Sequence, residues 1–120
     1  MLRFAFRSLP LLALILVAGC GCHRSGEEAL SPSGARVAVA RQAPTVDCHP
    51  LAYLVGESRA GRWSGHSKAK VVEGAVTDLR NKAGNAGANY VQSDSPQWAG
   101  RNAATVSGTA YRCDAEPTIR

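Results

Sequence analysis

Cysteine and histidine are the residues of this 120-residue chain whose chemistry could be most specific, because thiolates and imidazoles bind zinc and copper. The three histidines occur in Cys22-His23, in Cys48-His49 and as an isolated His66, and the other two cysteines are Cys20 and Cys113. This spacing matches no closed metal-binding motif, and an oxidised Cys48 could not be a ligand. We therefore expect no metal site and no cofactor, and place the histidines on the surface.

Hydrolytic chemistry has little support in the sequence. Ser64, His66 and Ser67 are close together, but neighbours in one loop rarely supply a nucleophile, a base and a group that orients the base. The chain has no Gly-x-Ser-x-Gly elbow, no phosphate-binding loop and no dinucleotide-binding fingerprint. The sequence thus predicts a protein that is not an enzyme.

The clearest chemical signal is Cys20, which closes an N-terminal export signal. Two arginines precede a short apolar run, Leu9 to Ala18, which Gly19 and Cys20 follow. Ten residues rise only about 15 Å as a helix, roughly half the hydrocarbon thickness, so the run is too short for a stable membrane span. The pattern resembles the bacterial lipobox, in which a diacylated cysteine becomes the new N-terminus. We expect residues 1–19 to be a lipoprotein signal peptide and Cys20 to be lipidated; an ordinary cleaved signal peptide is the alternative.

The charge of the mature chain argues against nucleic-acid binding. The formal net charge is +5, from 14 basic and 9 acidic residues. Residues 1–19 hold two of the basic residues and none of the acidic ones, so 12 basic and 9 acidic residues, a net +3, remain after cleavage. Basic and acidic residues are interspersed from Glu57 to Asp94. The expected partners are the membrane, through the lipid anchor, and an envelope protein or peptidoglycan.

The segment after the anchor, residues 20–46, reads as a flexible tether. Glycine, serine, proline, alanine and charged residues dominate it, and Pro32 and Pro44 interrupt any helix. A short strand at Val37–Ala40 is the alternative for part of this segment. Cys22 lies here without an obvious partner.

Residues 47–114 read as a small α+β domain, and residues 115–120 as a tail. The continuous apolar run Leu51–Val55 predicts a buried strand. Apolar residues at helical spacing predict a helix from about Lys68 to Ala86, with Ser67 as N-cap, Gly87 as left-handed cap and an Asp78–Lys82 pair. Two further strands follow, Tyr90–Ser93 and Ala104–Tyr111, with a loop over residues 94–102 between them.

The order of these elements predicts a β-α-β-β topology, with one helix packed on a three-stranded mixed sheet. The helix between the first two strands favours a right-handed crossover that makes them parallel, and the loop favours an antiparallel third strand. Placing the third strand between the other two brings Cys113 beside Cys48. Because export puts both thiols in an oxidising compartment, we expect a Cys48–Cys113 disulfide, which would stabilise the fold by about 4 kcal/mol.

Short motifs within this domain carry a resemblance to a known family. A cysteine precedes the first strand, the helix runs into Gly87-Ala88-Asn89-Tyr90-Val91, and the last strand reads Gly108-Thr109-Ala110-Tyr111-Arg112-Cys113. This pattern resembles small Gram-negative outer-membrane lipoproteins of an uncharacterised family, and is distantly similar to the folded domain of the envelope-stress lipoprotein RcsF. The resemblance implies a helix on a small sheet, disulfide stabilisation and attachment to the outer membrane on its periplasmic side.

Residues for recognition are sought in the loops. Arg62, Trp63 and Trp98 are of the types that are enriched at interface hot spots, although one tryptophan could instead close the core. The alternate residues of the last strand, from Thr105 to Tyr111, would form an exposed polar sheet face. The leading hypothesis is a non-enzymatic lipoprotein that binds or senses an envelope component through its loops or its open sheet face. The alternative is a structural or accessory module that maintains the envelope without a small ligand.

Overall fold

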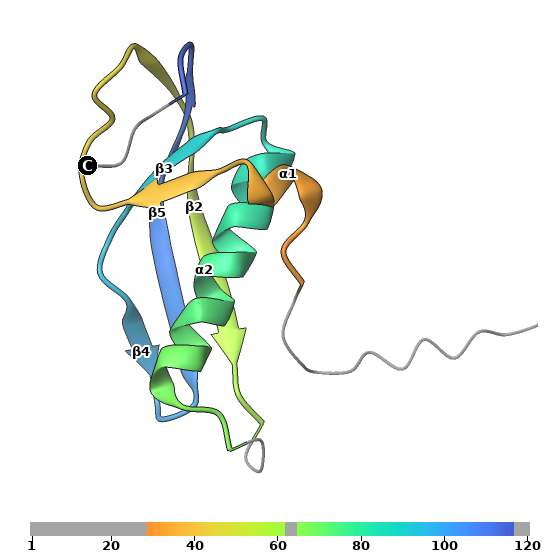
Figure 1. Ribbon diagram of the computed structural model, residues 1–120. Helices are drawn as coiled ribbons and strands as arrows, with labels where there is room; N and C mark the ends of the chain where they lie inside the picture. Colours follow the sequence, from red (N-terminus) through yellow and green to blue (C-terminus); the bar gives the residue numbers. More distant parts are fainter. Residues whose placement is uncertain (1–28, 62–64, 117–120) are drawn as a thin grey trace, which may run out of the picture.

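The computed structural model describes residues 29–61 and 65–116, which build one sheet with α2 packed across one of its faces (Figure 1). The predicted signal peptide, Cys20 and Cys22 lie outside the described residues, as do Arg62, Trp63 and residues 117–120 of the predicted tail. The elements, in chain order, are α1 (Pro32–Ala35), β1 (Ala38–Ala40), β2 (Cys48–Arg59), α2 (Lys68–Asn85), β3 (Tyr90–Ser93), β4 (Gln97–Ala99) and β5 (Ala103–Cys113).

The helix α2 has the ends that the sequence predicts, to within one residue. The Ser67 hydroxyl caps its first turn by accepting a hydrogen bond from the Lys70 amide at 3.3 Å, and Gly87 beyond its last turn has a φ of +85°. Its buried apolar residues recur every four positions and form one stripe against the sheet: Val71, Ala75, Leu79 and Ala83.

The sheet confirms the predicted class and the predicted central strand, but not the predicted number of strands. Its order is β1-β3-β5-β2, with β4 also paired to β5, so the last long strand does lie between the other two. Only β1 and β3 are paired in parallel; the other pairs are antiparallel. The prediction of three strands is wrong because β1 and β4 have only three residues each, which is too short for an alternating pattern to be recognised.

The folded part of the chain begins well before residue 47, inside the predicted tether. Ser31 caps α1 by accepting a hydrogen bond from the Gly34 amide at 3.0 Å, and Pro32 fills the first helical position. Val37 then enters the core at 1% exposure, and β1 matches the short strand that the sequence left as an alternative. The composition of this segment resembles a linker, but a four-residue helix and a three-residue strand are enough to hold it on the domain.

Asn81 of α2 fixes the point at which the chain joins the fold. Its Nδ2 donates to the Ala29 carbonyl at 3.0 Å, and its Oδ1 accepts from the Ser31 amide at 2.8 Å. Gly84, one turn further along α2, allows α1 to lie this close, because a Cβ there would come within 2.5 Å of the Ser33 carbonyl carbon. This close approach explains why a glycine, unfavourable inside a helix, occupies that position.

The predicted disulfide is present and closes one end of the sheet. Cys48, the first residue of β2, is bonded to Cys113, the last residue of β5, and the two are paired in the strand register. Asn89 reinforces this end, because its side chain accepts from the Cys113 amide at 2.7 Å and donates to the Cys113 carbonyl at 2.9 Å. The core between α2 and the sheet is made mainly of small residues: Val37, Ala75, Leu79, Ala83, Ala88, Val91, Val106 and Ala110.

Candidate functional site: the open sheet face

One face of the sheet packs against α2, and the opposite face has no helix of the described chain over it (Figure 1). Val106 and Ala110 of β5 belong to the core on the α2 side, so the alternate residues of β5 lie on the opposite face. Residues directly paired across strands share a face, which adds residues of β2 and β3. Tyr90 shares this face through its pairing with Tyr111, but it is buried. We call this surface the open face; its more exposed residues include Tyr53, Val55, Glu57, Gln92, Thr105, Ser107, Thr109 and Tyr111.

The strand β2 carries exposed apolar side chains, in contrast to the buried strand that the sequence predicts. Leu51, Tyr53 and Val55 are 45%, 62% and 40% exposed. The prediction is wrong because β2 is an edge strand that α2 covers on one side only, so half of a continuous apolar run faces outward. Three of the five large exposed hydrophobic residues in the described chain therefore lie on this one strand.

The side chain of Tyr53 is fixed on the open face although its ring is largely exposed. Its hydroxyl lies 2.7 Å from Asp94 Oδ2 and 2.9 Å from Ser107 Oγ, and Ser107 Oγ is 3.3 Å from the same carboxylate oxygen. Asp94 is itself placed by its backbone amide, which donates to the Ser107 carbonyl at 2.8 Å. An exposed aromatic ring held in this way loses little freedom when it binds a partner.

The chemistry of this hydrogen-bonded group favours recognition over catalysis. The two hydroxyl groups and the carboxylate lie on an exposed surface, and none of the three residues is a histidine that could act as a base near neutral pH. What the group does present is an aromatic ring beside a row of hydroxyl side chains on β5. Such a surface can bind a partner through ring contacts and hydrogen bonds.

One end of the open face is made rigid by two tyrosines. The Tyr90 hydroxyl donates to the Gln42 carbonyl at 2.6 Å, and the Tyr90 and Tyr111 rings meet edge to face with centroids 6.5 Å apart. Burial raises the pKa of Tyr90 above its ordinary value, and the neighbouring Tyr111 raises it further. Tyr90 therefore stays neutral at physiological pH, and the segment after β1 is held against this end of the sheet.

Two side chains of α2 cover the middle of the outer edge of β2. Asp78 of α2 accepts a hydrogen bond from the Glu57 amide at 2.8 Å, and Lys82 donates to the Val55 carbonyl at 2.8 Å. Asp78 and Lys82 also form the predicted i,i+4 ion pair, at 2.8 Å. Because unpaired edge groups attract foreign strands, this pair blocks strand addition at the middle of β2.

The residues that the sequence singled out do not assemble into one site. Trp98 is paired with Ala104 on the α2 side of the sheet, is 39% exposed, and lies 5.4 Å from Lys68 Nζ in a cation–π contact. It lies on β4, within the segment that the sequence predicts as a loop. Arg62 and Trp63 fall outside the described residues, so their proposed meeting with Trp98 stays a prediction.

The metal pattern gives no constellation in the described part of the chain, and Ser64 of the hydrolase pattern lies outside the described residues. Cys48 is oxidised in the disulfide with Cys113 and cannot bind a metal ion. His49 lies on the surface, 4.0 Å from Asp114. The Ser67 hydroxyl caps α2. Residues 29–61 and 65–116 hold no group of three histidine, cysteine or acidic side chains that could bind a metal ion. Within the same residues, no helix combines the length and apolarity needed to cross a membrane.

Sequence reasoning missed Tyr53 and Asp94 as site residues. They are 41 positions apart, and only the pairing of β2, β3 and β5 brings them together. The only local signal was a tyrosine at the centre of an apolar strand, which is equally typical of a buried position.

Comparison with known proteins places the chain in a family without assigning it an activity. Neither the curated proteins nor the solved structures contain a significant match to it. Residues 28–113, well over half of the chain, match a family described as a domain of unknown function (DUF4156). This match covers every helix and strand of the structure, from α1 to β5. The chain therefore belongs to the DUF4156 family.

Proposed function

We propose that this protein is a lipid-anchored, non-catalytic binding module of the bacterial cell envelope. In this proposal Cys20 carries the lipid, the domain is attached to the outer membrane and faces the periplasm, and the open face binds or senses an envelope component. The observation that carries the proposal is Tyr53, which is 62% exposed while its hydroxyl is fixed by Asp94 at 2.7 Å. Ordering an exposed ring has no benefit for the core, but it favours binding.

The composition of the open face suits an extended envelope partner, either a protein segment or peptidoglycan. An aromatic ring and Val55 offer apolar contact, and the hydroxyl groups of Thr105, Ser107 and Thr109 offer hydrogen bonds along β5. The Cys48–Cys113 disulfide supports export to an oxidising compartment, which is where such partners occur.

The lipid anchor would hold the domain close to the membrane. The Ala29 carbonyl accepts a hydrogen bond from Asn81 of α2, and Ala29 lies nine positions after Cys20. A chain of that length spans at most about 30 Å when fully extended. Mass spectrometry of the membrane-extracted protein should find acyl chains on Cys20. An unmodified Cys20, or an N-terminus elsewhere, would contradict this part of the proposal.

Removal of the exposed side chains of β2 tests the binding role. The double substitution Tyr53→Ala with Val55→Ser should reduce the adducts formed by chemical cross-linking in cells about tenfold or more, which corresponds to at least about 1.4 kcal/mol of binding free energy. The free energy of unfolding, measured by thermal denaturation, should change by no more than about 1 kcal/mol, because both side chains are largely exposed.

Trp98→Ala is the control, since Trp98 is a large apolar residue about as exposed as Val55 but lies on the α2 side of the sheet. This variant should keep the adducts. If the adducts persist in the double variant and disappear in the Trp98 variant, the binding surface lies on the α2 side of the sheet. Persistence in both variants would favour an accessory module that uses neither surface.

A further inference from the structure

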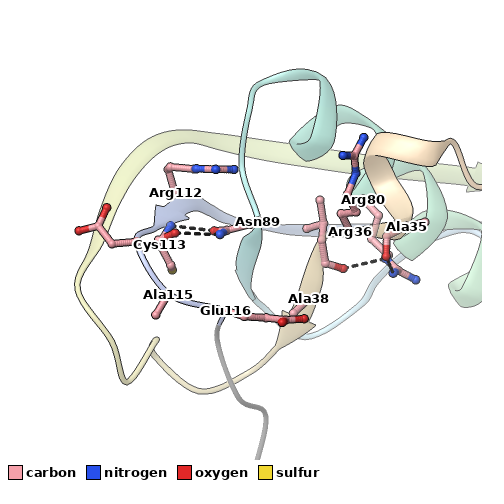
Figure 2. Close-up of a pocket in the computed structure, with 11 residues that line it drawn as sticks. Ala35, Arg36, Ala38, Arg80, Asn89, Arg112, Cys113, Ala115 and Glu116 are labelled. Atoms are coloured by element: carbon pink, nitrogen blue, oxygen red, sulfur yellow. Dashed lines mark hydrogen bonds between the residues drawn. The ribbon is translucent and has the colours of Figure 1, made fainter.

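A cleft of about 620 Å³ lies at the disulfide end of the domain, away from the hydrogen-bonded group around Tyr53. Arginines from three different elements line it: Arg36 at the end of α1, Arg80 on α2 and Arg112 on β5 (Figure 2). A volume of this size lies in the range of small-molecule sites. No local sequence pattern indicates this cluster, because its members are separated by 44 and 32 positions.

Arg80 is held in one orientation by the backbone that enters the domain. Its Nε donates to the Val37 carbonyl at 3.0 Å and one terminal nitrogen donates to the Ala35 carbonyl at 3.2 Å. A guanidinium has five N–H donors, so Arg80 retains donors that these carbonyls do not use. Asn89, which also lines the cleft, is fixed as well. Its side-chain Nδ2 donates to the Cys113 carbonyl, and its Oδ1 accepts from the Cys113 backbone amide. Arg80 and Asn89 are therefore in place before any ligand binds.

The positive charge of the cleft is only partly balanced by the acidic residues that line it. No ion pair joins Arg36, Arg80 or Arg112 to a carboxylate of the described residues, although Asp114 and Glu116 line the same cleft. Three arginines and two acidic residues leave a net charge of +1 at the cleft. Asp114 Oδ2 lies 4.0 Å from His49 Nε2.

We propose that this cleft binds the phosphate group of a small organic phosphate ester. Guanidinium groups bind phosphate oxygens through charge-assisted hydrogen bonds, and the lining of this cleft supplies arginine donors from three elements. The remaining volume accommodates the organic part of the ester. The phosphate belongs either to a lipid headgroup or to a soluble metabolite.

The position of the cleft favours the lipid headgroup, a step that rests on the proposed lipid anchor. The chain joins the domain through Asn81, the residue next to Arg80. If Cys20 is lipidated, this junction lies within about 30 Å of the membrane surface. Phospholipid phosphates are then the most concentrated phosphate esters near the cleft.

The test uses the purified full-length mature protein, labelled with ¹⁵N, in micelles of a nonionic detergent. Titration with inorganic phosphate, at constant ionic strength set with chloride, should shift the amide signals of Arg36, Asn89 and Arg112 in a saturable way. The double substitution Arg36→Gln with Arg112→Gln should weaken phosphate binding about tenfold or more. Neither side chain forms a hydrogen bond within the described chain, so the variant should fold normally.

Arg101→Gln is the control, because it removes one exposed positive charge outside the cleft and should leave phosphate binding unchanged. Cleft signals that do not move, or a loss of affinity that is equal in the control, would overturn the proposal. Addition of short-chain phosphatidylglycerol to the micelles, compared with soluble glycerol 3-phosphate, then identifies the source of the phosphate. An unmodified Cys20 would remove the argument for the lipid source but would not alter the phosphate titration, so the two proposals fail separately.

Discussion

Replacing both Cys48 and Cys113 by serine should lower the free energy of unfolding by about 4 kcal/mol. The bond links residues with a sequence separation of 65. Without it the unfolded chain gains conformational entropy, and this gain corresponds to about 4 kcal/mol of free energy at 25 °C. A domain of this size is stabilised by roughly 5–10 kcal/mol in total, so the variant should keep only a small margin. Thermal unfolding followed by circular dichroism should show a fall in the melting temperature of about 15–30 °C.

Cys22→Ser serves as the control for this experiment, because Cys22 has no part in the Cys48–Cys113 bond. It should unfold like the unchanged protein under oxidising conditions. Reduction of the unchanged protein should reproduce the destabilisation of the double variant. A double variant within about 1 kcal/mol of the unchanged protein would mean that strand pairing and Asn89 suffice to hold the two strand ends together.

Gly56→Ala should destabilise the protein by about 3 kcal/mol, because β2 and α2 meet here backbone to backbone. A Cβ at position 56 would collide with the Ala75 carbonyl oxygen, and would lie 2.6 Å from both the Leu79 amide nitrogen and the Leu79 Cβ. These atoms belong to the helix itself, so relief requires α2 to move away from the sheet. Chemical denaturation should show a lower midpoint with a similar slope.

Gly74→Ala is the matched control from the same helix–strand contact. Its Cβ would meet the Ser58 side chain, whose hydroxyl can rotate away, and alanine also favours the helix. This variant should stay within about 1 kcal/mol of the unchanged protein. If Gly56→Ala were equally mild, the contact between α2 and β2 would be looser than the structure indicates.

The sequence predicts the elements that are long and strongly patterned. The apolar stripe of α2, its Ser67 cap and the left-handed Gly87 are local signals, and each is found where the sequence places it. The disulfide follows from the central position of β5, since only that order brings Cys48 beside Cys113.

The remaining features depend on tertiary contacts that leave little local trace. β1 forms because it pairs with β3. α1 packs against α2 because Asn81 accepts a hydrogen bond from the Ser31 amide and Gly84 leaves room for the α1 backbone. The exposure of Tyr53 depends on which face of β2 the helix covers, and a run that is apolar on both sides does not reveal this. The arginine cleft likewise exists only after three distant elements have packed together.

The most direct test of the proposed binding role is site-specific photo-crosslinking in living cells. A photoreactive phenylalanine derivative would replace Val55 or Thr109 on the open face and, in parallel, Glu73 on the solvent side of α2. If the open face binds a partner, discrete adducts should form from the two open-face positions and none from position 73. Adducts from position 73 alone, or none from any position while the domain remains folded, would contradict the assignment of the open face as the binding surface.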